Sequence, residues 1–223
     1  MDSAASAGAE GRAEPGPVFD SLAGQPEVRA ALARAAWVAR SWMSGDGGQD
    51  SAAVRAHAEA AVGAMTHAWL FTGPPGSGRT VAARAFAAAL QCSDPAIVGC
   101  GQCRGCVTVL AGTHPDVHVA RTERLSLQLA DVRSVIERGN SRPVSGNFSV
   151  VIVEDADRLT EQAGNALLKV IEEPSGRAIF MLCAPTDDPA DVMVTLRSRS
   201  RHVYLRTPGA EAVEAVLRAD PDV

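Results

Sequence analysis

Hydrophobic residues follow two periods along the chain, and their alternation predicts the fold class. Five continuous apolar runs have the length and composition of buried strands, and they cover residues 68–73, 117–121, 148–156, 178–185 and 202–206. Between these runs, apolar residues recur every three or four positions, as on one face of a helix, over 79–92, 127–140 and 160–173. Strands that alternate with amphipathic helices are typical of a three-layer α/β domain with a parallel central sheet.

The two ends of the chain follow different patterns. Residues 1–16 are small and polar, and we expect them to be a disordered tail. Residues 17–207 form the α/β domain, in which Pro26 opens a first helix. A glycine-rich stretch at about 43–52 predicts a flexible insertion, and an alanine-rich helix follows it. The last stretch, 208–223, begins a new amphipathic helix, so we expect it to start a second, helical domain in which the chain stops.

The composition narrows the class of protein. Hydrophobic residues make up 46% of the chain but aromatic residues only 4%, so the core must be mainly aliphatic. The formal net charge of −5 argues against a surface coated for nucleic-acid binding, although it allows a local basic patch. No stretch of 18 apolar residues occurs, and the N-terminus lacks the pattern of a secretory signal. We therefore expect a soluble cytoplasmic protein with no membrane partner.

The stretch FTGPPGSGRT has the spacing of a phosphate-binding loop and lies between a predicted strand and a predicted helix. Glycines let the backbone approach phosphate oxygens closely, and a helix N-terminus adds partial positive charge at the same point. Thr80 stands where a hydroxyl holds Mg²⁺ in such loops. The candidate nucleotide-binding residues are Gly73, Pro74, Pro75, Gly76, Ser77, Gly78, Arg79 and Thr80.

One residue of this loop departs from the usual pattern, because Arg79 occupies the lysine position. The planar guanidinium is wider than an ammonium group, so the exchange is not conservative at a tight site. Backbone donors supply much of the binding of phosphate, whereas hydrolysis depends on charge placed within a fraction of an ångström. We therefore expect Arg79 to impair hydrolysis of a nucleotide more than its binding. Whether this loop binds a nucleotide, and whether it hydrolyses one, are separate questions at this point.

The predicted strand at 148–156 ends in three acidic residues, Glu154, Asp155 and Asp157. Carboxylates at the carboxyl end of a strand, near a phosphate loop, usually serve Mg²⁺ and the attacking water. The common order is Asp then Glu, but here Glu154 precedes Asp155, so each carboxylate is displaced by about one methylene. Glu154 and Asp155 are therefore candidate catalytic residues, and their reversed order is a second departure from an active ATPase site, after Arg79. The alternative interpretation is that these acids belong to a solvated loop with no catalytic role.

Four of the five cysteines lie close together in the sequence, which suggests a metal more than disulfides. Seven, two and two residues separate the successive members of the group Cys92, Cys100, Cys103 and Cys106. Four thiolates with no open position are typical of a structural zinc site, so residues 92–106 predict a zinc module. An iron–sulfur cluster and reduced thiols without a metal are the alternatives. His114 is a weak further candidate, and Cys183 fits a small core residue.

Three longer stretches together resemble the bacterial DNA polymerase III clamp-loader subunits, which belong to the AAA+ class. They are LTEQAGNALLKVIEEP at 159–174, the cysteine loop directly after the phosphate-loop helix, and TLRSRSRHVYL at 195–205. The stretch VFDSLAGQ at 18–25 resembles the segment that covers the adenine side of the site in that family. The resemblance runs from about Val18 to the end, and it implies an AAA+ P-loop domain followed by a helical lid domain.

Within this family a motor subunit hydrolyses ATP, and a delta-prime subunit does so poorly or not at all. Arg79 and the order Glu154–Asp155 match the second kind. The family's arginine finger lies in a Ser-Arg-Cys motif, which Ser198-Arg199-Ser200 matches with serine in place of cysteine. The resemblance therefore implies that Arg199 reaches the ATP site of a neighbouring subunit, although a solvated basic edge is the plain alternative. Thr186 stands where the family has a polar sensor of the γ-phosphate.

The resemblance also implies partners and a place in DNA replication. They are the motor (gamma/tau) and delta subunits of a hetero-oligomeric ring, and, through that assembly, the sliding clamp and primed DNA. Zinc would be structural, and ATP with Mg²⁺ stays an open cofactor. The alternatives are an active ATPase motor subunit of the same loader, an unrelated P-loop ATPase such as a helicase, and a zinc-dependent scaffold that never meets nucleotide.

Overall fold

The computed structural model describes residues 14–44, 66–174 and 177–219. Most of the predicted tail, most of the predicted insertion and the alanine-rich helix predicted after it lie outside the described residues.

Five parallel strands form the sheet, and each falls within one of the apolar runs or starts one residue before it. In spatial order they are β2 (Val117–Ala120), β3 (Ser149–Val153), β4 (Ala178–Ala184), β1 (Ala68–Thr72) and β5 (Arg201–Tyr204). Every residue of β1, β3 and β4 is buried, as expected for strands covered on both faces. Leu70 of β1 is aligned with Leu182 on one side and with His202 on the other.

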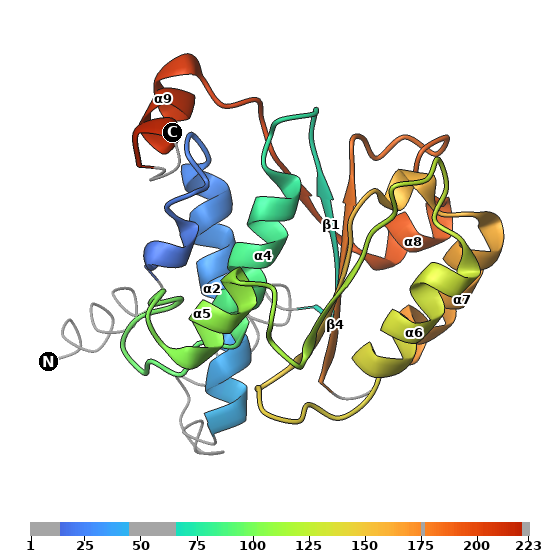
Figure 1. The fold of residues 1–223 in the computed structure, drawn as a ribbon, viewed down its shortest axis with the longest axis horizontal. Helices are drawn as coiled ribbons and strands as arrows, with labels where there is room; N and C mark the ends of the chain where they lie inside the picture. The colour runs from blue at the N-terminus through green and yellow to red at the C-terminus, as the bar shows by residue number, and fades with distance from the viewer. Residues whose placement is uncertain (1–13, 45–65, 175–176, 220–223) are drawn as a thin grey trace, which may run out of the picture.

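Helices cover both faces of the sheet, so the predicted three-layer α/β architecture is confirmed (Figure 1). One layer contains α2 (Pro26–Ser44), α4 (Arg79–Leu90) and α5 (Arg104–Leu110). The other contains α6 (Leu129–Gly139), α7 (Glu161–Glu172) and α8 (Val194–Arg199). Two 3₁₀ turns, η1 (Pro17–Phe19) and η2 (Ala156–Arg158), precede α2 and α7, and α9 (Ala210–Ala219) follows β5.

Small residues let the first layer pack closely. Eight of the twelve residues of α4 are buried, and six of these are alanines. They face buried alanines of α2, which include Ala33 and Ala36. Side chains without γ atoms allow two helices to approach closely, so a core with few aromatics still excludes water. One aromatic pair joins this layer to the sheet, with the rings of Trp69 and Phe86 edge to face at 4.8 Å.

Two buried polar side chains hold the loop before β3. Gln91, which ends α4, donates to the Phe148 carbonyl at 2.6 Å and accepts from the Asn147 N–H at 2.8 Å. Asp116 accepts from the backbone N–H groups of residues 144–146 at 2.6 to 2.8 Å. Burial opposes ionisation of Asp116, but these hydrogen bonds outweigh it and lower its pKa. The loop is therefore fixed by side chains that contact its backbone.

The sequence pattern did not predict α5 and α8, which have seven and six residues. Helices of fewer than two turns leave too few apolar positions to show a period. The helix expected from residue 208 is present as α9, and Val213, Val216 and Leu217 on it are exposed. Its assignment to a lid domain stays a prediction. Among the described residues, no helix has both the length and the apolar character needed to cross a membrane.

Candidate nucleotide edge, arginine finger and metal centre

The predicted site residues on the sheet follow three strands whose carboxyl ends lie at one edge. The phosphate loop follows β1, the acidic residues follow β3, and Thr186 comes two residues after β4. The Gly73 N–H donates to the Pro185 carbonyl at 3.2 Å. This hydrogen bond joins the first residue after β1 to the first residue after β4. Parallel α/β sheets bind ligands at this edge, so the sequence placed these candidates correctly relative to the fold.

The backbone of the phosphate loop has the shape that glycine allows. Gly76 and Gly78 have φ values of 82° and 87°, in the left-handed region, and Gly78 precedes the first turn of α4. A Cβ on Gly73 would lie 2.3 Å from the Leu205 carbonyl oxygen, so a side chain does not fit there. The Ser77 hydroxyl is buried and has no hydrogen-bond partner among the residues that the structure describes. Loop, helix end and hydroxyl therefore fit an anion such as a phosphate group.

Arg79 turns back onto its own loop. Its guanidinium Nη1 donates to the Gly73 carbonyl at 2.5 Å, six residues earlier in the chain. The charged group thus lies against the backbone that would surround a phosphate. An arginine that grips a phosphate here must first leave this carbonyl.

Arg84 is a charged neighbour that the sequence reasoning missed. It lies on α4 four residues after Thr80, and Nη2 is 2.9 Å from Glu154 Oε1. The side chain of Glu154 is only 16% exposed, so the ion pair is partly shielded from water. The signal was the spacing of four, which places Arg84 on the same face of α4 as Thr80. Glu154, predicted for the metal position, therefore already has a cationic partner within the chain.

The other two acids differ in their surroundings. Asp155 has φ 58°, the one left-handed non-glycine residue in the described part of the chain, and its carboxylate is 3.9 Å from Arg158. Oδ1 of Asp157 is buried and makes no hydrogen bond to any described residue. Asp155 is the second residue after the buried strand β3, and its left-handed backbone turns the chain sharply there.

Three of the candidate residues, Thr80, Arg79 and Glu154, act on the pKa of one buried thiol, Cys183. Burial raises the pKa of Cys183 to about 12, and the negative charge of Glu154 adds to this effect. The charge of Arg79 and a hydrogen bond with Thr80 act in the opposite direction. The predicted core position of Cys183 is confirmed, since it is 2% exposed within β4.

Thr186 is exposed, and its hydroxyl is engaged next to the strand end. Oγ1 donates to Asp191 at 2.6 Å and accepts from the Asp188 N–H at 3.0 Å. The predicted sensor residue therefore lies at the correct edge of the sheet, with its hydroxyl held in a local turn.

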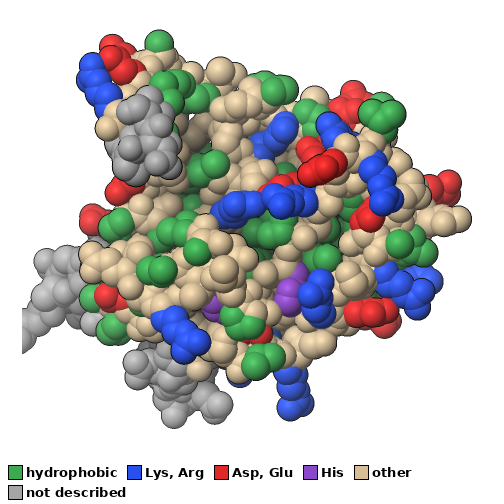
Figure 2. All heavy atoms as spheres, viewed as in Figure 1, with side chains coloured by type: hydrophobic (Ala, Val, Ile, Leu, Met, Phe, Trp, Pro, Cys, Tyr) green, Lys and Arg blue, Asp and Glu red, His purple; other side chains and the backbone are tan. Residues whose placement is uncertain are grey.

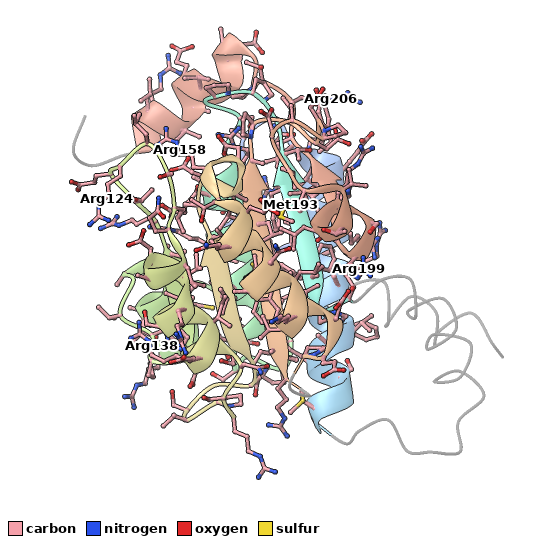
Figure 3. All side chains as sticks on the ribbon, turned by 90° about the vertical axis from the view of Figure 1, so that its right-hand side faces the viewer. Arg124, Arg138, Arg158, Met193, Arg199 and Arg206 are labelled. Carbon is pink, nitrogen blue, oxygen red and sulfur yellow. The ribbon has the colours of Figure 1, made fainter. Side chains whose placement is uncertain are left out.

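Arg199 is the last residue of α8, far from Arg124 and Arg158 on the side of the molecule shown in Figure 3. Nη2 lies 2.9 Å from Glu172 Oε1 at the end of α7, and both side chains are more than 40% exposed. Nη1 donates to the Thr195 carbonyl at 3.2 Å. Ion pairs this exposed contribute at most about 1 kcal/mol, so Glu172 holds the guanidinium only weakly.

Helix α8, which ends at Arg199, packs against α7. Met193, labelled in Figure 3, ends the segment before α8, and its Sδ lies 2.3 Å from where a Cβ would stand on Gly164. Because residue 164 is glycine, α8 and the segment before it can pack closely against α7. The two neighbouring arginines have other contacts, because Arg197 lies 3.3 Å from Asp187 and Arg201 lies over the Trp69 ring at 5.2 Å. The three arginines are thus not equivalent.

The four cysteines form one group at the other end of α4. The Sγ atoms of Cys92, Cys100, Cys103 and Cys106 all lie within 4.8 Å of one another. Four sulfurs at 2.3 Å from a tetrahedral ion stand about 3.8 Å apart, and Cys103 Sγ is 3.9 Å from Cys92 Sγ. A hydrogen bond with Cys106 lowers the pKa of Cys92, whereas burial raises the pKa of Cys100. The four residues fit a bound metal ion, as predicted.

His114 does not belong to this group. It is buried, and its Nδ1 accepts from the Asp116 N–H at 3.1 Å. Burial lowers its pKa, so it stays neutral in this turn.

Comparison with known proteins decides the family. A family model described as DNA polymerase III, delta subunit, matches residues 48–209. The chain belongs to this family. A delta-prime subunit from Pseudomonas aeruginosa is 37% identical over 160 residues, which are 70% of this chain and 48% of that protein. The delta-prime subunit of Escherichia coli is 41% identical over 145 residues, 64% of this chain and 43% of that protein.

Subunits named gamma/tau also match the chain, at an identity between those of the delta-prime relatives. A DNA polymerase III gamma/tau subunit from Mycobacterium tuberculosis is 34% identical over 157 residues, 70% of this chain and 27% of that protein. The predicted resemblance to the delta-prime subunit of bacterial DNA polymerase III is therefore confirmed, and an unrelated P-loop enzyme is excluded. The chain spans about half the length of the delta-prime relatives that it matches.

Solved structures support the fold class. The Thermotoga maritima RuvB Holliday junction branch migration motor superposes with a TM-score of 0.52 at 17% identity, over 92% of this chain and 53% of that one. A gamma-subunit-related protein of the same organism gives 0.50 at 22% identity, over 68% of this chain and 49% of that one. At these identities the likeness concerns the fold alone, which is that of an AAA+ domain.

Basic and acidic side chains are interspersed over the face of this family member seen in Figure 2. On that face they do not gather into one continuous basic surface, in keeping with the net charge of −5. Strong binding of nucleic acid by a single basic face is therefore not indicated there.

Proposed function

We propose that this chain is the stator of a DNA polymerase III clamp loader and lends Arg199 to the ATP site of a neighbouring motor subunit. The observation that carries the proposal is the position of Arg199, at the exposed end of a short helix, where its ion pair with Glu172 is weak and its hydrogen bonds are local ones to Thr195 and Ser198. A guanidinium held loosely at a surface loses little when it moves to a triphosphate. Such a finger is worth roughly 10³ to 10⁵ in turnover.

Two features of the chain's own candidate nucleotide site, at the carboxyl ends of β1 and β3, support weak or absent ATP hydrolysis there. The guanidinium of Arg79 is bonded to the loop carbonyl of Gly73, and Glu154 is paired with Arg84. The loop backbone fits a phosphate, so nucleotide binding and hydrolysis are separate questions for this site. If bound, Mg²⁺ would be held by Thr80 and Glu154 and would supply charge neutralisation at the phosphates.

For the cysteine group we propose a structural zinc ion, held by Cys92, Cys100, Cys103 and Cys106. Four thiolates in a tetrahedral arrangement are the donor set that zinc prefers in closed sites. The ion would stabilise the loop that they define, without a catalytic role.

The partners follow from the stator role. They are motor subunits of the same fold, a clamp-opening delta subunit and, through the assembly, the sliding clamp and primed DNA in the cytoplasm. Contact with DNA would be shared between subunits and directed at the phosphate backbone, in keeping with the acidic balance of this chain.

The test is ATP turnover by the reconstituted loader that carries the full-length protein with Arg199→Ala. Turnover is expected to fall by about 10³-fold or more, with ring assembly unchanged. Arg197→Ala is the matched control, since Arg197 is two residues away and pairs with Asp187 instead. Wild-type turnover with Arg199→Ala would remove the finger role.

The second candidate function is that of an active ATPase motor. The complete glycine backbone of the phosphate loop and the gamma/tau relatives favour it. Measurable, Mg²⁺-dependent ATP turnover by the isolated, zinc-loaded, full-length protein would support this alternative. Turnover only in the assembled ring would support the stator.

A further inference from the structure

The cysteine loop also holds the leading segment, residues 15–22. The Gly16 N–H donates to the Val98 carbonyl at 2.9 Å, and the Val18 N–H donates to the Gly99 carbonyl at 3.2 Å. Pro15 forms an isolated parallel bridge with Val98. Val98 and Gly99 directly precede the metal-ligand candidate Cys100, so any ion that fixes the loop also fixes these two acceptors.

The contact is too close for side chains on either side. A Cβ on Gly16 would lie 2.5 Å from the Gly99 carbonyl oxygen, and a Cβ on Gly99 would lie 2.3 Å from Val18 Cγ2. Gly99 also has φ +80°, which other residues rarely adopt. Glycines at both positions therefore serve the contact between loop and segment, as well as the turns of the metal site.

Helix α2 is fastened to the same loop. Arg40 donates to the Ile97 carbonyl at 3.2 Å and to the Asp94 carbonyl. The Asp94 carboxylate in turn accepts from the Ala96 and Ile97 N–H groups at 2.9 and 3.0 Å. The loop between Cys92 and Cys100 thus holds both the leading segment and the helix that follows it.

The other end of the leading segment lies against the phosphate loop. Phe19 and Leu22 are buried in the same core as α4, and Leu22 Cδ2 lies 3.8 Å from the Cβ position of Gly78 in the phosphate loop. Just beyond it, the Gln25 side chain donates to the Arg206 carbonyl at 2.5 Å and accepts from its N–H at 3.3 Å. The segment therefore connects the metal loop with the phosphate loop.

We propose that a metal ion bound to the four cysteines keeps the leading segment in place on the cysteine loop, a role that we call a clasp. With an ion bound to the four thiolates, residues 97–99 keep the shape that receives the Gly16 and Val18 amides, and Leu22 stays against the phosphate loop. Without the ion, the segment separates while the sheet stays folded. This role is independent of Arg199, so it stands or falls apart from the stator function.

Hydrogen exchange on the full-length protein tests the clasp, with zinc bound and after its removal by a chelator. Amides of residues 16–22 are expected to exchange about tenfold faster or more without zinc, while those of β3 and β4 keep their protection. Unchanged exchange in 16–22 after verified zinc loss would overturn the proposal. Equal loss of protection in β3 and β4 would overturn it too, because the ion would then support the whole domain.

A substitution on the segment side separates the clasp from metal binding. Gly16→Ala places a methyl group against the Gly99 carbonyl and changes no residue of the cysteine loop. Zinc content is expected to stay at one ion per chain, while amide exchange of residues 18–22 rises about tenfold or more. Gly209→Ala is the control, because its Cβ meets nothing within 4 Å. Wild-type exchange in Gly16→Ala would contradict the clasp.

Discussion

The two ends of helix α4 carry the two candidate sites, and they are built in opposite ways. At its N-terminal end the charged side chains are paired inside the chain, Arg79 with the Gly73 carbonyl and Arg84 with Glu154. Just beyond its C-terminal end, four cysteine sulfurs converge within 4.8 Å of one another. The charged side chains of the first site are paired without a ligand, whereas the second site has the geometry of a set of metal ligands.

The phosphate loop can therefore keep its structure without a ligand, whereas the cysteine group needs a bound metal ion. A phosphate loop keeps its shape through glycine conformations and backbone contacts, whether or not its cation faces a phosphate. Four thiols close together repel one another as they ionise, unless a cation lies between them. The C-terminal end of α4 should therefore respond far more strongly to substitution than the N-terminal end.

The largest effect is expected from Cys103→Ser. Loss of one thiolate should reduce zinc content to a small fraction of one ion per chain and destabilise the domain by about 3 kcal/mol or more. For a domain of this size that corresponds to a fall in Tm of about 6–12 °C. Metal analysis and thermal unfolding of the same preparation measure both quantities.

Cys183→Ser is the matched control for that experiment. Cys183 is buried in β4 and is not one of the grouped cysteines, so the variant should lose stability while keeping its zinc. Full zinc content in Cys103→Ser, with wild-type Tm, would show that the four sulfurs are not a metal site.

An intermediate effect is expected from Gln91→Ala, which changes the end of α4 without changing a cysteine. Gln91 satisfies the Asn147 N–H and the Phe148 carbonyl, and its removal leaves buried backbone groups unpaired. The expected cost is about 1–3 kcal/mol of unfolding free energy, with zinc retained. Denaturant unfolding measures it, and loss of zinc together with stability would show that the two features are not separate.

The smallest effect is expected from Arg79→Lys at the opposite end. Lysine restores the usual cation, but Glu154 and Asp155 stay in reversed order and Glu154 stays paired with Arg84. ATP turnover by the isolated full-length protein should therefore rise by no more than about tenfold. Fast turnover in this variant would mean that the arginine alone limits the site.

The sequence predicted features that depend on neighbouring residues. The apolar runs predicted all five strands, and the cysteine spacing predicted the sulfur group, because each is specified within a short segment. The glycine loop was likewise predicted between β1 and α4.

Features that depend on distant residues were not predicted. The partners of Glu154 and Arg199 lie 70 and 27 positions away in the chain, and no local pattern indicates them. The contact of Gly16 with Gly99 was also missed, since both glycines are compatible with ordinary turns. Short helices such as α8 were missed because six residues show no clear period.

The central claim is that Arg199 serves a neighbour's ATP, and it is tested most directly by the structure of the assembled loader with an ATP analogue bound. The account predicts that the Arg199 guanidinium has left Glu172 and lies about 3 Å from a phosphate oxygen of the neighbouring subunit's triphosphate. A loaded ring in which Arg199 still lies on Glu172, with no contact to that triphosphate, would contradict it.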